Sequence, residues 1–245
     1  MVSQSKGFCK YCGKEYTRGG MYRHICTCRE RKKALGAETG KQEGGYFQML
    51  LYGKYDGDYW LLIEMEETAT LEELDRFIRD IWVECCGHLS AFNIEGTRYE
   101  PCMDGEDDWY GASEEDMSCM LKDVLLQGLV MGYQYDFGST TELVIKVLGH
   151  GAGAVNRDTV TILSRNIPPE IFCSKCGRRP AEWISPWRYY EADAFRCGKC
   201  LEEEEEQNPD SEEWYLPVCN SPRMGVCGYE GSSIYPDVFL PDKKA

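Results

Sequence analysis

The pattern of hydrophobic and polar positions separates a central body, residues 46–167, from two cysteine-rich ends. The body begins with two strand-like runs, 46–52 and 59–65, and a turn rich in glycine and aspartate lies between them, which predicts a β-hairpin. Strands are also expected at 89–94, 130–137, 142–148 and 159–163. The glycines at 149, 151 and 153 are expected to form a flexible hairpin loop.

Two helices are expected in the body. Thr70 and Glu73 form the pattern of a capping box, which marks a helix start. A helical stripe of apolar residues follows, namely Leu71, Leu74, Phe77, Ile78, Ile81, Trp82 and Cys85. The second helix is expected near 117–127, after an acidic loop at 103–116. The body is therefore predicted to be α+β, with a mostly antiparallel central sheet and helices on one face.

Residues 1–34 carry the pattern of a small zinc finger. Cys9 and Cys12 form one close pair, and His24 and Cys28 lie four residues apart, where a helix places both on one face. The spacing of Phe8, Tyr16 and Met21 around these ligands is typical of the core of a ββα finger. Cys26 lies only two residues from His24, so it is expected to point elsewhere.

Residues 170–205 carry a second ligand set, Cys173, Cys176, Cys197 and Cys200, which resembles a zinc ribbon. Four cysteines leave no position for water, so catalysis is not expected at this second metal. Two zinc ions, one in each set, are predicted. An acidic, proline-containing tail follows at 206–245. Cys219 and Cys227 are interpreted as ordinary thiols, and His88 and His150 have no spaced ligand or nucleophile partner.

The net charge of −15 is unevenly distributed along the chain. Residues 1–41 hold ten Lys/Arg against three Glu, a charge of +7, which leaves −22 for the other residues. A glycine-rich segment at 35–45 is interpreted as a linker behind this basic arm. The arm favours contact with nucleic-acid phosphates, although a solubilising surface explains the same charges. The candidate phosphate-binding residues are Lys10, Lys14, Arg18, Arg23, Arg29, Arg31, Lys32 and Lys33.

The cysteine pairs and the lack of an export signal predict reduced thiols and a cytoplasmic protein. No run of eighteen apolar residues is present. The catalytic patterns are weak. Asp136-Phe137-Gly138 lacks the other motifs of a kinase, and the acidic groups 106–108 and 114–116 are typical of solvated loops.

The central residues resemble the plasmid pRiA4b ORF-3-like family, whose members are also described as passenger proteins of insertion sequences. The resemblance rests on His88-Leu89-Ser90-Ala91-Phe92, Tyr99, Tyr133-x-Tyr135-Asp136-Phe137-Gly138 and Glu142-Leu143. It implies a compact α+β domain from bacterial genomes and mobile elements, without known catalytic residues. The sequence departs from the family at Ser139-Thr140-Thr141, where many relatives have an acidic residue and Trp.

Tyr133, Tyr135 and Phe137 alternate along a strand and would share one face of the sheet, with Asp136 on the other. Two interpretations remain open. The rings form a core layer beside a turn-capping Asp136, or the four residues line a binding groove.

The sequence is compatible with three functions. The first is a non-enzymatic zinc adaptor whose basic finger holds nucleic acid and whose acidic body holds a protein partner. The second is a pure protein-interaction module with two structural zinc ions. The third is a metal-dependent nuclease centred on Asp104, Glu106, Asp107 and Asp108.

Overall fold

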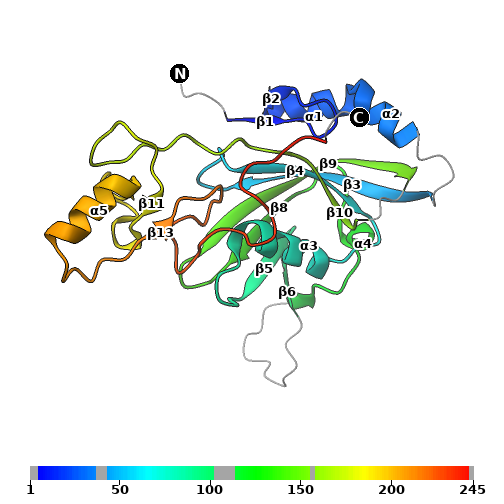
Figure 1. The fold of residues 1–245 in the computed structure, drawn as a ribbon. Coiled ribbons are helices and arrows are strands. Elements are labelled where there is room, and N and C mark those ends of the chain that lie inside the picture. Colours follow the sequence, from blue (N-terminus) through cyan, green and yellow to red (C-terminus); the bar gives the residue numbers. More distant parts are fainter. Residues whose placement is uncertain (1–4, 37–42, 102–113, 155–157, 243–245) are drawn as a thin grey trace. The chain divides into compact units, whose positions relative to one another are not determined.

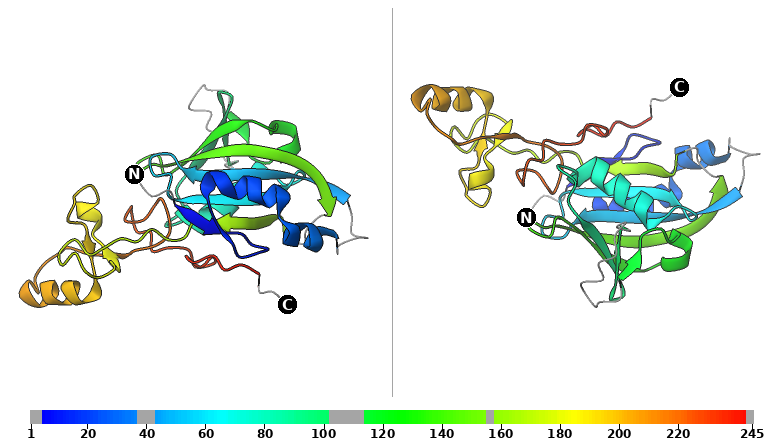
Figure 2. Two further views of the ribbon diagram at one scale, coloured as in Figure 1. Left: turned by 90° about the horizontal axis from the view of Figure 1, so that it is seen from above. Right: turned by 90° about the horizontal axis from the view of Figure 1, so that it is seen from below.

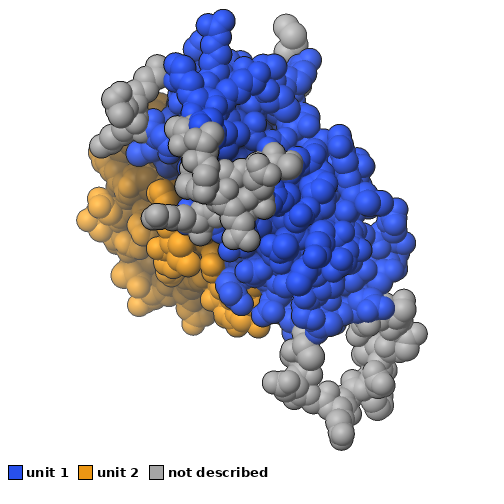
Figure 3. Space-filling model, turned by 90° about the vertical axis from the view of Figure 1, so that its right-hand side faces the viewer, with its two compact units in different colours: residues 1–78, 89–167, 238–245 blue, residues 79–88, 168–237 orange. Residues whose placement is uncertain are grey.

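The computed structural model describes residues 5–36, 43–101, 114–154 and 158–242. The chain forms two compact units, coloured separately in Figure 3. We call residues 1–78, 89–167 and 238–245 the sheet unit, and residues 79–88 and 168–237 the ribbon unit. None of the helices within the described ranges is long and apolar enough to cross a membrane.

The sheet unit is built on an eight-stranded sheet, in which all neighbours run antiparallel except the last pair. This confirms the predicted α+β class with a mostly antiparallel sheet. In order across the sheet the strands are β10 (Val160–Arg165), β4 (Trp60–Glu66), β3 (Glu43–Gly53), β9 (Thr141–Ala154), β8 (Val130–Tyr135), β5 (Ser90–Ile94), β6 (Thr97–Glu100) and β7 (Glu114–Asp116).

Helix α3 (Leu71–Ile78) and the short helix α4 (Leu121–Val124) lie on one face of this sheet (Figure 1). The capping box is confirmed, because the Thr70 amide donates to Glu73 Oε2 at 2.8 Å and the Glu73 amide donates to Thr70 Oγ1 at 3.2 Å. The helix continues as a π-helical turn, η1 (Arg79–Val83), in which the Glu84 amide donates to the Arg79 carbonyl at 2.9 Å. This wider turn ends the apolar stripe before Cys85.

The zinc finger covers the opposite face of the sheet and does not stand apart from it (Figures 1 and 2). Cys9, Met21, Ile25 and Cys28 share one buried cluster with Trp60, Leu62 and Leu163 of the sheet. Strand β4 is consequently buried on both faces over most of its length. The finger consists of β1 (Lys6–Phe8), β2 (Glu15–Thr17), α1 (Arg18–Thr27) and α2 (Arg29–Gly36).

Three boundaries differ from those expected. Residues 35–36 end a helix and residues 43–45 begin a strand, so only 37–42 of the expected linker lie outside the described residues. The glycine-rich stretch 149–153 is not a hairpin loop, because it continues β9 and pairs with β3. Most of the expected 103–116 loop is not described, but 114–116 form a strand, and the helix near 117–127 shortens to α4.

The ribbon unit holds a three-stranded sheet and its own buried cluster of Ile184, Ala194, Leu216, Cys219, Met224 and Tyr229. Residues 206–237 therefore do not form a separate tail, since they supply one strand and four of the six residues of this cluster. The elements are β11 (Trp183–Ile184), the 3-10 helix η2 (Pro186–Arg188), β12 (Phe195–Arg196), α5 (Gly198–Gln207) and β13 (Leu216–Pro217).

Candidate metal centres

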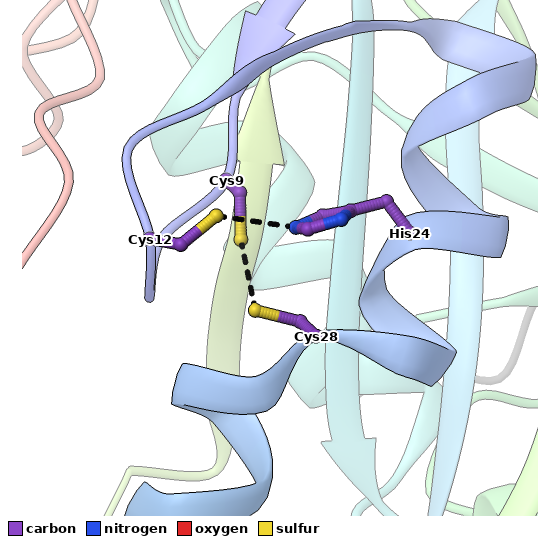
Figure 4. A group of neighbouring side chains, drawn as sticks. All are labelled: Cys9, Cys12, His24 and Cys28. Atoms are coloured by element: carbon purple, nitrogen blue, oxygen red, sulfur yellow. Dashed lines mark hydrogen bonds between the residues drawn. The ribbon is translucent and has the colours of Figure 1, made fainter.

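The four predicted ligands of the finger converge on one point (Figure 4). Cys9 and Cys12 lie in the turn between β1 and β2, His24 projects from α1, and Cys28 lies where α1 meets α2. Cys12 Sγ is 3.2 Å from His24 Nε2, and Cys9 Sγ is 4.0 Å from Cys28 Sγ. A tetrahedral zinc ion needs ligand separations of about 3.8 Å between two sulfurs and about 3.5 Å between sulfur and nitrogen. The finger therefore fits zinc.

Local structure explains this convergence. Gly13 adopts a positive φ of 68°, and its amide donates to the Cys9 carbonyl at 2.9 Å, which closes the turn that pairs the two thiols. Tyr16 stacks on His24 with 4.1 Å between ring centroids. Burial and the nearby charge of Lys14 lower the pKa of His24, which favours the neutral imidazole that binds metal. Cys26 is exposed and outside the group, as its spacing predicts.

The ribbon gathers Cys173, Cys176, Cys197 and Cys200 within 4.8 Å of one another. The first pair lies in a turn closed by the Gly177 amide, which donates to the Cys173 carbonyl at 2.8 Å. The second pair lies at the start of α5. Backbone amides of Arg178 and Arg179 lower the pKa of Cys176 to about 6, so the thiolate that binds zinc is favoured there.

Three residues of the predicted phosphate-binding set have partners outside the finger, and exposed Lys33 pairs with Glu30 within it at 3.3 Å. Arg31 is buried and pairs with buried Glu64, which removes it from the set. Arg18 donates to the Gly57 carbonyl at 2.8 Å, and Lys10 Nζ lies 3.5 Å from an Asp242 carboxylate oxygen. The remaining members have exposed side chains, namely Lys14, Arg23, Arg29, Lys32 and Lys33.

Two of the three rings of the resemblance motif belong to the core, and the third, that of Phe137, does not. Tyr133 and Tyr135 are buried, and the Tyr133 hydroxyl donates to Asp75 Oδ1 at 2.8 Å. Asp136 adopts a positive φ of 63° and accepts from the Gly138 amide at 3.0 Å, so it caps the turn. This turn ends the alternation and leaves Phe137 exposed, beneath the Arg98 guanidinium. The core interpretation is the one that the packing supports.

Sequence reasoning missed a third ligand group. Cys85, Cys86, His88 and Cys227 offer atoms that lie within 4.8 Å of one another. Cys227 and His88 therefore have the partners that their sequence spacing did not reveal. The available signal was the Cys-Gly dipeptide, which occurs at the predicted ligand positions 12–13, 176–177 and 197–198 and recurs at 86–87 and 227–228.

His150 and Cys219 belong to none of the three ligand groups, and both have partners within the fold. His150 Nε2 lies 2.7 Å from Glu67 Oε2, and its ring stacks on Phe47. Cys219 packs in the ribbon unit's buried cluster, as expected of an ordinary thiol. The suggested nuclease residues Asp104, Glu106, Asp107 and Asp108 lie outside the described residues.

Comparison with known proteins gives one family match and one similar solved structure. Residues 54–172 match the family model described as "Plasmid pRiA4b ORF-3-like protein". Among solved structures, a protein of unknown function from Methanosarcina mazei Go1 is similar at 17% identity, with a TM-score of 0.43 over 50% of this chain and 70% of that one. No curated protein matches the chain. The matched central domain, residues 54–172, belongs to the plasmid pRiA4b ORF-3-like family.

Proposed function

We propose that this protein is a non-enzymatic, zinc-stabilised adaptor that holds a nucleic-acid backbone with its finger and a basic protein segment with its ribbon unit. The proposed binding of nucleic acid rests on five exposed basic side chains on α1, α2 and the finger turn, namely Lys14, Arg23, Arg29, Lys32 and Lys33. They lie on a chain whose other residues are strongly acidic.

The physical reason is charge placement. Lysine and arginine that neutralise phosphates release condensed counterions, which favours binding without reading the base sequence. The acidic remainder of the chain repels a polyanion, so contact is confined to the finger. The metal groups support an adaptor because each offers four protein ligands, which leaves a zinc ion no open position for water.

The experiment replaces basic residues and keeps the finger, because the finger shares its core with the sheet and its deletion would expose Trp60 and Leu62. The test variant is Arg23→Gln/Arg29→Gln/Lys32→Gln. Binding of the full chain to mixed-sequence duplex DNA and to single-stranded RNA is measured by fluorescence anisotropy across a salt series. Loss of three phosphate contacts is expected to reduce the slope of log K against log salt by about 2.7 on duplex DNA.

The control makes the same charge change at exposed helical positions outside the finger, with Arg76→Gln/Lys122→Gln/Lys199→Gln. Its salt slope is expected to equal that of the unaltered protein. Equal slopes for both variants would reject the finger as the binding surface. Absence of binding by the unaltered protein at low salt would favour the alternative, a protein-interaction module with structural zinc sites.

The proposed binding of a basic protein segment rests on an acidic groove of about 970 Å³ in the ribbon unit, beside α5. Glu205 and Asp210 line it with exposed side chains, together with Glu204 and Glu213, and this charge favours a lysine- or arginine-rich segment. The nearby 3-10 helix exposes Trp187, which is 60% accessible and reports binding by fluorescence. Glu205→Gln/Asp210→Asn is expected to weaken binding of an oligo-arginine peptide, whereas Glu72→Gln/Asp123→Asn on the sheet unit leaves it unchanged.

A further inference from the structure

Cys85, Cys86, His88 and Cys227 lie in the geometry of a tetrahedral metal site. The Sγ atom of Cys86 is 3.6 Å from that of Cys85 and 3.8 Å from that of Cys227. His88 Nε2 lies 3.0 Å from Cys86 Sγ and 3.6 Å from Cys227 Sγ. Three of these four separations agree closely with the edges of a zinc tetrahedron, about 3.8 Å between sulfurs and about 3.5 Å between sulfur and nitrogen.

Special backbone conformations bring these side chains together from segments about 140 residues apart. The π-helical turn that ends at Val83 delivers Cys85 and Cys86, and such turns recur at functional sites. Gly87, with a φ of 78°, reverses the chain so that His88 faces Cys86. Cys227 has a φ of 55°, which is disfavoured for a residue with a Cβ. Such a conformation at a residue that presents a thiol to three other ligands is typical of a functional site.

The surroundings of the group resemble those of the predicted ribbon site. The buried guanidinium of Arg223 donates to Cys85 Sγ at 3.4 Å, as Arg179 donates to Cys197 Sγ at 3.9 Å. A divalent ion with three thiolates and one imidazole carries a net charge of −1, and a fixed guanidinium offsets that charge. Ser221 Oγ also donates to the Trp82 carbonyl at 2.6 Å, which holds the two segments in register.

We propose that Cys85, Cys86, His88 and Cys227 bind a third zinc ion, which joins residues 79–88 to the C-terminal segment of the ribbon unit. Three thiolates and an imidazole are ligands that zinc prefers, and their number fills its coordination. Cys86 and Cys227 are exposed, whereas every ligand of the finger and the ribbon is buried or half-buried. The third ion is therefore the first to leave when a chelator competes for it. This inference does not depend on the proposed function.

The full chain, purified under reducing conditions with zinc, is examined by native mass spectrometry. Three zinc ions per chain are expected, falling to two in Cys227→Ser and in His88→Ala. The matched control is Cys26→Ser, which removes an equally exposed thiol outside the three groups and should keep three ions. Two zinc ions in the unaltered chain, or a disulfide between Cys86 and Cys227, would overturn the proposal.

A second measurement uses only the unaltered chain, in case the variants fold poorly. A chelator is titrated in, and thiols are alkylated and identified by peptide mass spectrometry at each step. Loss of the first zinc ion should open Cys85, Cys86 and Cys227 to alkylation together, while Cys9, Cys28 and the ribbon cysteines stay protected. Alkylation of Cys86 and Cys227 as fast as that of Cys26 in the zinc-loaded protein would refute the site.

Discussion

The finger and the ribbon each gather four metal ligands, but they differ in what surrounds those ligands. In the finger, Cys9 and Cys28 are part of a buried cluster that includes Trp60, Leu62 and Leu163 of the sheet. In the ribbon, the buried cluster around the metal site consists of the ligand cysteines alone, and the apolar residues Ile184 and Ala194 belong to a separate cluster. A bound metal and hydrophobic packing would therefore share the stabilisation of the finger's ligand site, whereas the ligand turns of the ribbon would depend on the metal. Similar ligand spacing in a sequence does not imply similar dependence on zinc.

The largest expected effect comes from removing one ligand at each site. Cys12 and Cys176 are a matched pair, because each is half-buried and precedes a glycine of positive φ. Cys176→Ser is expected to unfold the ligand turns at 173–177 and 197–200, since zinc supplies about 10–16 kcal/mol of folding free energy in small zinc modules. Cys12→Ser should release its metal but leave the amides of β4 protected. Hydrogen exchange measured by mass spectrometry checks both, and equal unfolding at the two ends would contradict the comparison.

The next effect tests a contact that anchors the finger to the sheet. Arg31 of α2 and Glu64 of β4 form a buried ion pair, and Gln48 Nε2 donates to the same carboxylate oxygen at 2.7 Å. Arg31→Met leaves Glu64 buried without its guanidinium, at an expected cost of about 3–5 kcal/mol in the free energy of unfolding. The double variant Arg31→Met/Glu64→Met should recover most of that loss. Urea denaturation of the full chain measures both, and an equally unstable double variant would argue against the buried charge as the cause.

This pair also shows where sequence reasoning fails. Arg31 belongs by charge to the basic arm, and nothing in its neighbourhood indicates a partner 33 residues away. The local features were predictable: the first hairpin, the Thr70 capping box, and the finger and ribbon ligand sets follow from short-range spacing. Long-range packing was not predictable from the sequence, so the finger was expected to be a module joined to the central body by a linker. For the same reason Cys227 was assigned as an ordinary thiol, since its partners lie about 140 residues earlier.

A smaller loss of stability is expected from a substitution in the apolar part of the interface between the finger and the sheet. Ile25 is fully buried in the cluster shared with Trp60 and Leu62. Ile25→Ala is expected to lower the free energy of unfolding by about 2–5 kcal/mol and to weaken zinc retention by the finger. Ile234→Ala is the control, because this side chain is 61% exposed and its loss should change stability by about 0.5 kcal/mol or less. Similar effects at both positions would mean that the finger is not anchored by its core.

The smallest expected change in the free energy of unfolding comes from substitutions at the N-termini of α3 and α1. Thr70 precedes α3 and accepts from the Glu73 amide, whereas Thr17 is the N-cap of α1 and its side chain makes no capping hydrogen bond. The ligands of the finger fix the position of α1 instead, because His24 lies on that helix and Cys28 at its end. Thr70→Ala should therefore cost about 1 kcal/mol in the free energy of unfolding. Thr17→Ala, the same substitution where the hydroxyl forms no capping bond, should cost much less. Equal losses in urea denaturation would mean that the metal does not replace the cap.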